Sequence, residues 1–232
     1  MESFRNQDMR AEQQLGEFMD RYFYSQLKDR NGNSLNYTRM SDKESQMNGV
    51  DVCIELESRK MLIDEKATLY YSNAMIPTFA FELDSIQKGH SEPVQGWFVN
   101  DELQTEYYML IWPNVKCIQQ GNQWIRKDIK SLGKNDFTII EAMLVRKTDI
   151  RHALKRIGCD RRHLLKYAKD IRKLCSDENV KREKDLTGDV KVSFSGQLAE
   201  KPVNLVIQKK LLKKLAQGIY LISSDGYATI KG

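Results

Sequence analysis

The sequence predicts an α/β protein: an N-terminal helix, then a mixed β-sheet, then an appended basic α+β region. Three observations support this fold class. Residues 10–28 carry apolar side chains at helical spacing, strand-like runs recur between residues 50 and 145, and helical patterns return at Thr148. We therefore expect a core domain over residues 1–145 and a basic helical and small α+β region over residues 146–232.

The helix at 10–28 is predicted by a broad apolar stripe. Glu12 projects to the same side of the helical wheel as this stripe, so its carboxylate is expected near the buried side. Glycine and asparagine in residues 29–34 then end the helix. The stripe consists of Leu15, Phe18, Met19, Tyr22, Phe23 and Leu27.

Strands are expected next. An antiparallel hairpin is predicted from two strand-like runs, residues 50–56 and 61–71, which the short polar link 57–60 joins. Further strands are predicted at 78–83, at 106–112 ending before Pro113, and at 137–145.

The C-terminal region begins with two predicted helices. The first follows Thr148 and ends at Gly158, and the second begins near Asp160. Residues 176–189 are highly charged and are expected to form a loop. The remaining elements expected are strands at 190–195 and 203–208, a helix at 209–217 and a strand at 218–223.

Composition bounds the function. The chain has 232 residues, a net charge of +5, 41% hydrophobic and 30% charged residues, which excludes a disordered chain. No run approaches the ~18 apolar residues of a membrane span, and the polar start is unlike a signal peptide. We expect a cytoplasmic protein with no membrane partner. Its four cysteines lack CxxC spacing, which argues against a zinc site or a disulfide framework.

Two carboxylates and one ammonium group carry the chemical information. Asp64 and Lys66 are two residues apart in a strand, so their side chains share one face. The predicted hairpin brings Asp51 beside them. Charged groups in core strands must be paired or hold a metal ion. Two neighbouring carboxylates suit Mg²⁺ or Mn²⁺, and the lysine can position or activate a water molecule or stabilise charge on a phosphate.

These residues resemble the motif of the PD-(D/E)XK, or restriction-endonuclease-like, nuclease superfamily. The resemblance lies in Gly49-Val50-Asp51 and in Ile63-Asp64-Glu65-Lys66-Ala67, and it extends over roughly residues 10–112. Val50 stands where the nominal motif has proline. The family fold is α-β-β-β-α-β with a mixed sheet, and the helix 10–28 followed by three strands matches its first four elements.

The resemblance implies roles for two further residues. Some members place a glutamate of the first helix near the metal, and Glu12 corresponds to it. The main-chain carbonyl between the acid and the lysine also binds metal in the family, and here that residue is Glu65. One departure is visible, because residues 84–105, with Gly89, Pro93 and Gly96, lack the pattern of the family's second core helix.

A basic segment marks the expected nucleic-acid surface. Residues 146–184 contain 14 Lys and Arg against 6 Asp and Glu, and phosphate contacts favour such an excess. The two predicted helices around Gly158 have helix-turn-helix proportions. The residues expected to contact nucleic acid are Arg161, Arg162, Lys166, Lys169 and Lys173; the other interpretation is a solvated helical face.

The sequence thus predicts a Mg²⁺- or Mn²⁺-dependent nuclease that hydrolyses phosphodiester bonds, with Asp51, Asp64, Lys66 and Glu12 at its site. DNA is favoured over RNA by the resemblance alone. The alternative is a non-catalytic nucleic-acid-binding or interaction module on the same fold, in which the acids only pair with Lys66. A homodimer is compatible with the sequence, which does not require one.

Overall fold

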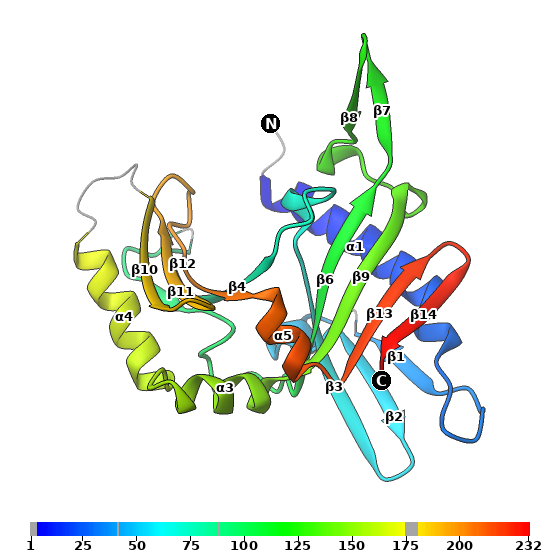
Figure 1. Cartoon of the computed structure of the whole chain (residues 1–232), viewed down its shortest axis with the longest axis horizontal. Helices are drawn as coiled ribbons and strands as arrows, with labels where there is room; N and C mark the ends of the chain where they lie inside the picture. Colours follow the sequence, from blue (N-terminus) through cyan, green and yellow to red (C-terminus); the bar gives the residue numbers. More distant parts are fainter. Residues whose placement is uncertain (1–3, 41, 88, 175–180) are drawn as a thin grey trace.

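Two large β-sheets, a separate two-stranded sheet and five α-helices make up the described part of the structure, a computed structural model that describes residues 4–40, 42–87, 89–174 and 181–232 (Figure 1). The larger sheet has seven strands in the order β1-β2-β3-β6-β9-β13-β14 and is mixed, because β3 and β6 run parallel and the other neighbours run antiparallel. Its strands are β1 (Asn36–Arg39), β2 (Val52–Leu56), β3 (Arg59–Ala67), β6 (Tyr107–Val115), β9 (Phe137–Arg146), β13 (Gly218–Ser223) and β14 (Gly226–Lys231).

The second sheet has five antiparallel strands in the order β10-β11-β12-β4-β5. They are β4 (Thr78–Ser85), β5 (Val94–Gln95), β10 (Lys181–Thr187), β11 (Val190–Ser195) and β12 (Val203–Gln208). Each sheet therefore draws strands from both sides of position 145: β4 and β5 join β10–β12, and β13 and β14 return to the larger sheet. A separate hairpin is formed by β7 (Cys117–Gln120) and β8 (Gln123–Arg126).

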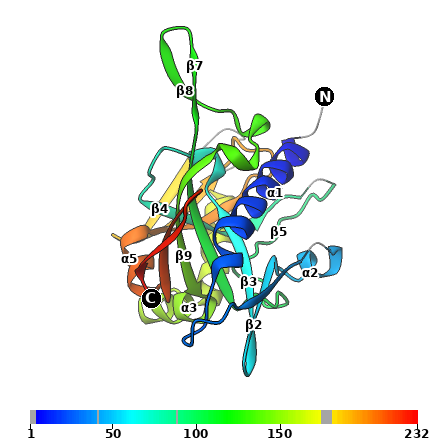
Figure 2. The same ribbon diagram turned by 90° about the vertical axis from the view of Figure 1, so that its right-hand side faces the viewer.

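The helices cover opposite faces of the larger sheet. α1 (Phe4–Tyr22) lies across one face, as Figure 2 shows. It packs there through Leu15, Phe18 and Met19. The other face packs against the second sheet and the remaining long helices. These are α3 (Lys147–Arg156), α4 (Arg161–Lys173) and α5 (Lys209–Leu215); α2 (Lys43–Met47) is a short helix before β2. The central strand β6 is buried almost throughout, which explains its continuous apolar sequence.

Most predicted elements are present, with shifted ends. The hairpin of β2 and β3 is confirmed. β3 ends at Ala67, because the chain turns through a short 3₁₀ segment at Leu69–Tyr71. β6 continues past Pro113 to Val115 through an irregularity in its pairing with β9, the kind of position at which a strand tolerates proline.

The expectation that a helix and then three core strands match the family's first four elements is wrong in detail. The first strand, β1, is a short polar segment that the sequence pattern did not indicate, and β4 pairs with β12 in the second sheet. β10 is a strand where a loop was expected, although residues 175–180 lie outside the described residues. Its side chains are mostly exposed and charged, which is typical of an edge strand protected against aggregation.

Candidate metal and phosphodiester site

Asp51 comes directly before β2 and lies close to Asp64 of β3. Val52 pairs with Ile63, and the backbone N–H of Asp51 donates a 2.9 Å hydrogen bond to the Ile63 carbonyl. Asp51 therefore lies just beyond the last pair of the ladder, and its charge is close enough to Asp64 to raise the pKa of that carboxyl. Asp64 in turn pairs with Tyr108 of β6, so three polar side chains cross neighbouring strands.

Strand alternation separates the charged face from the helix-covered face. Ile63 belongs to the core under α1, whereas Tyr108 belongs to the core between the two sheets. Asp64 and Lys66 consequently point toward the layer that contains Tyr108 and Trp97, and the intervening Glu65 points toward α1.

Asp64 is the most buried charge of the cluster. Only 1% of it is exposed, and its Oδ1 accepts a 2.5 Å ion-paired hydrogen bond from Lys66 Nζ. Burial raises the pKa of Asp64 to about 7, and the neighbouring Asp51 charge adds to the shift while Lys66 opposes it. The Asp64 Oδ2 atom is buried and accepts no hydrogen bond from any group that the structure describes.

Lys66 remains a cation in this surrounding. Burial disfavours its charged form, but Asp64, Asp51 and the more distant Glu12 outweigh that effect and raise the pKa of Lys66. Its Nζ also lies 5.4 Å from the centre of the Trp97 ring, a favourable cation–π position. The Lys66 side chain as a whole is 29% exposed.

Glu65 fixes the backbone between the two functional residues. Its N–H donates a 2.8 Å hydrogen bond to Asp51 Oδ2. On the opposite face its carboxylate accepts hydrogen bonds of 2.8 Å from the Tyr24 hydroxyl and 2.6 Å from Arg39. Arg39 also pairs with Asp20 of α1 at 2.7 Å.

The carbonyl of Glu65 lies at the same edge of β3 as its N–H. The Leu62 carbonyl accepts a hydrogen bond from the N–H of Glu106, the residue before β6. The Ile63 carbonyl accepts one from the N–H of Asp51, on the opposite edge of β3. Since backbone groups alternate between the two edges of a strand, the Glu65 carbonyl points, like that of Ile63, toward Asp51. The position is the one that the family resemblance assigns to a main-chain ligand.

Glu12 is placed less closely than expected. It is exposed, whereas its helical position had indicated the buried side of α1; the neighbouring Gly16 takes that side and is buried. The α1 helix nevertheless brings Glu12 close enough to Lys66 to contribute to its raised pKa.

Three further polar residues border the site, and sequence reasoning did not select two of them. The Tyr108 hydroxyl is buried without a hydrogen-bond partner among the described residues, and burial, then Asp64, raises its pKa. Lys147 is 6% exposed; burial and then Arg151 lower its pKa to about 8, against opposing contributions from Asp101 and Asp64. The places of Lys147 and Tyr108 beside the site depend on the pairing of β6 with β9, which no local sequence pattern indicates. Burial raises the pKa of Glu82 in β4, an effect that the hydrogen bond from Ser85 and the charge of Lys66 oppose.

Within the described residues, no group of three or more His, Cys, Asp or Glu side chains is arranged to hold a metal ion. The two carboxylates that converge are those of Asp51 and Asp64. A backbone carbonyl completes the oxygen-rich edge.

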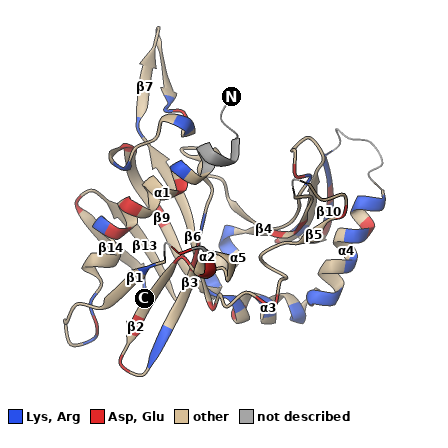
Figure 3. Ribbon diagram, turned by 180° about the vertical axis from the view of Figure 1, so that it is seen from behind, with Lys and Arg blue, Asp and Glu red and all other residues tan. Residues whose placement is uncertain are grey.

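The predicted nucleic-acid residues divide into two groups. Arg161 is committed to the fold, because it donates to the Val99 carbonyl at 2.6 Å and pairs with Asp101 at 2.9 Å. The other four follow α4 at helical spacing, opposite its buried Leu164, Ala168 and Ile171, so they form an exposed basic stripe. Figure 3 shows Lys and Arg positions recurring along α4. This α4 stripe consists of Arg162, Lys166, Lys169 and Lys173.

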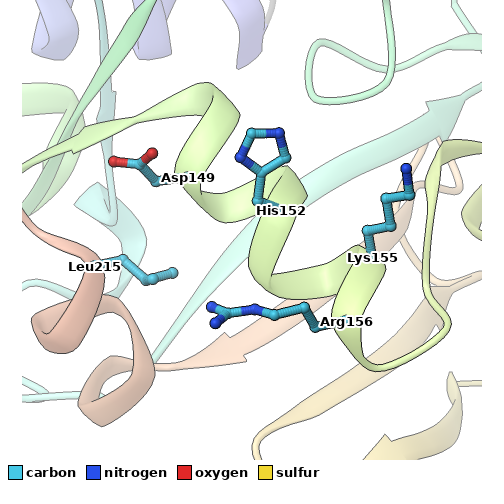
Figure 4. Close-up of a pocket in the computed structure, with 5 residues that line it drawn as sticks. All are labelled: Asp149, His152, Lys155, Arg156 and Leu215. Carbon is cyan, nitrogen blue, oxygen red and sulfur yellow. The ribbon is translucent and has the colours of Figure 1, made fainter.

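A large open cavity of about 690 Å³ lies elsewhere, between α3 and α5 (Figure 4). Leu215 of α5 and four residues of α3 line it: Asp149, His152, Lys155 and Arg156. Asp149 accepts a 2.9 Å hydrogen bond from Gln217. None of these residues belongs to the carboxylate cluster, so the cavity is separate from the candidate site.

No family model matches the chain, and no curated protein or solved structure shows significant similarity to it. Among the described residues, none of the helices combines the length and apolar character required to cross a membrane.

Proposed function

We propose that this protein is a metal-dependent nuclease of the PD-(D/E)XK type that hydrolyses phosphodiester bonds, with DNA as the substrate that the resemblance implies. One observation carries the proposal. The carboxylate of Asp51, held by the Glu65 N–H, lies close to that of Asp64, and Lys66, on the same face of β3 as Asp64, contacts Asp64.

The residues present fit a divalent cation. The buried Asp64 Oδ2 accepts no hydrogen bond from a described residue. The nearby Asp51 charge also disfavours the ionised form of Asp64, and a cation between them would remove this repulsion. Asp51, Asp64 and the Glu65 carbonyl would hold Mg²⁺ or Mn²⁺ through hard oxygen ligands, with Glu12 as a further ligand. Such a cation, when bound, neutralises phosphate charge and lowers the pKa of a water molecule.

The protein's own groups have distinct tasks. Lys66 keeps its proton at neutral pH, since its pKa is raised; it therefore donates hydrogen bonds to a water molecule or to a phosphate oxygen and does not act as a base. The Glu65 N–H holds Asp51 in position. Trp97 lies beside Lys66, and Tyr108 lies beside Asp64 on the neighbouring strand.

The fold supports the same proposal in part. α1 precedes a mixed sheet in which the acid-bearing strands β2 and β3 are adjacent and antiparallel, and β6 follows in parallel. The connection from β3 to β6 departs from the family pattern. It passes through β4 and β5 of the second sheet, and its described residues contain no α-helix.

The second candidate is a nucleic-acid-binding module without catalysis. Its supporting observation is the ion pair itself, because Lys66 already neutralises Asp64. The exposed α4 stripe would serve either candidate.

Metal titration separates the candidates. We expect calorimetry to detect Mn²⁺ or Mg²⁺ binding to the wild type and a loss of that binding in Asp51→Asn. Cleavage of DNA by the wild type should require the same metal. A binding module instead shows salt-dependent DNA affinity with neither metal binding nor cleavage.

A further inference from the structure

The β7–β8 hairpin stands apart from both large sheets. It is a two-stranded sheet of its own, with Cys117 paired to Arg126 and Gln120 paired to Gln123 around a two-residue turn. Gly121 begins the turn with φ of 59°, a conformation that glycine adopts without strain. The hairpin projects beyond the body of the molecule in two perpendicular views (Figures 1 and 2).

Its root is held firmly. The side-chain amide of Asn73 donates to the Val115 carbonyl at 2.9 Å, and its oxygen accepts from the Val115 N–H at 2.7 Å. Arg126 donates to the Tyr70 carbonyl at 2.6 Å, and Lys127 pairs with Asp136 at 2.6 Å. The hairpin is therefore a ribbon with an anchored base, not a loose loop.

The chemistry of the ribbon fits a nucleic acid. Residues 115–127 include three basic and no acidic residues. Trp124 is 71% exposed near the tip, and Ile118 is 46% exposed. The tip presents amide side chains, which donate to and accept from base edges. These amides belong to Gln119, Gln120, Asn122 and Gln123.

We propose that the β7–β8 hairpin binds duplex DNA by inserting into its major groove. This inference rests on the proposed function for its choice of partner and adds a recognition element to it. The major groove admits a two-stranded ribbon. In this arrangement the amides at the tip would meet base edges, Trp124 would supply apolar contact, and the exposed Lys116 would pair with a phosphate. The lack of acidic residues favours this polyanionic partner over a second copy of the chain.

The test is fluorescence anisotropy with a labelled 30-base-pair duplex and EDTA, so that affinity is measured without cleavage. One variant is Trp124→Ala. A second replaces residues 118–125 by Asn-Gly, which keeps the pair of Cys117 and Arg126. Ile230→Ala, at an exposed residue of β14, is the matched control.

We expect affinity to fall roughly tenfold in Trp124→Ala, as for truncation of an aromatic anchor at an interface, and further in the shortened variant, with no change in Ile230→Ala. Equal duplex affinity in the wild type and shortened variant would overturn the inference. A wild-type dimer that the shortening converts to a monomer, with unchanged DNA affinity, would assign the hairpin to self-association instead. Hairpin-dependent binding without cleavage in Mg²⁺ would leave this inference standing and reject the nuclease.

Discussion

The backbone N–H of Glu65 donates a 2.8 Å hydrogen bond to the carboxylate of Asp51. Glu65 thereby ties together the two acid-bearing strands beyond the last pair of the β2–β3 ladder. Its side chain is fixed from the other face of the sheet by Tyr24 and Arg39. The position of the candidate site thus depends on a polar network that lies under α1.

Replacing Arg39 tests this network. Arg39→Ala leaves the largely buried Glu65 and Asp20 carboxylates without their cation. The free energy of unfolding, measured by urea denaturation, should therefore fall by about 2–4 kcal/mol. Lys60→Ala removes an exposed pair with Glu55 and should change stability by less than about 0.5 kcal/mol. Equal effects of the two substitutions would show that the network does not stabilise the fold.

Lys147 predicts a pH dependence of stability. Burial lowers its pKa to about 8 in the folded protein, from an ordinary value of 10.5. As pH rises, Lys147 therefore loses its proton in the folded state before it does so in the unfolded state. The free energy of unfolding consequently rises between about pH 8 and pH 10.5, and this gain is lost again as pH falls to about 8.

Lys147→Met removes this cost. Its free energy of unfolding at pH 7 should exceed that of the wild type by about 1–2 kcal/mol, and the difference should shrink as pH rises from 8 to 10.5. The exposed Lys155→Met on the same helix is the control, for which we expect a constant difference across this range. A pH-independent gain in Lys147→Met would contradict the assignment.

Gly96 is required by the close approach of two chain segments. A Cβ atom there would lie 2.5 Å from the backbone carbon and oxygen of Glu82. Gly96→Ala should cost about 1–3 kcal/mol in stability and displace the adjacent Trp97 from Lys66. Gly188→Ala, where the added carbon meets no atom within 4 Å, should be neutral or slightly stabilising. Chemical denaturation of both variants and near-UV circular dichroism measure these effects, and an unperturbed Gly96→Ala would refute them.

The α4 stripe predicts salt-dependent binding. Because each phosphate contact releases counterions, Lys166→Ala with Lys169→Ala should weaken duplex binding and reduce the slope of log K against log salt by about 2. Lys28→Ala with Lys60→Ala removes the same charge from exposed positions elsewhere and should leave the slope nearly unchanged. The same slope in both double variants would exclude the stripe as the binding surface.

Local patterns predicted the parts of the fold that depend on neighbouring residues. The β2–β3 hairpin and the shared face of Asp64 and Lys66 follow from strand alternation and a short link, and both are present. Local patterns also predicted a strand at residues 78–83, and the family resemblance implied that it belongs to the same mixed sheet. Their partner, β12, lies more than 100 residues later, and no local pattern encodes such a pairing.

The candidate site could likewise be predicted from the sequence only where it depends on residues near one another in the chain. Tyr108 and Lys147 join it only through the pairing of β3 with β6 and of β6 with β9. Arg161 resembles the other basic residues of α4 in sequence, yet its contacts with Val99 and Asp101 commit it to the fold. These roles depend on tertiary contacts between segments distant in the chain.

The central claim is tested most directly by a cleavage assay on plasmid, single-stranded and branched DNA in Mg²⁺ or Mn²⁺. EDTA and Asp64→Ala serve as controls, with duplex affinity measured in parallel. We expect metal-dependent cleavage that EDTA abolishes and that falls at least roughly 100-fold in Asp64→Ala, while DNA affinity stays within about threefold of the wild type. Absence of cleavage on every substrate, together with absence of metal binding, would contradict the nuclease proposal and favour the binding module.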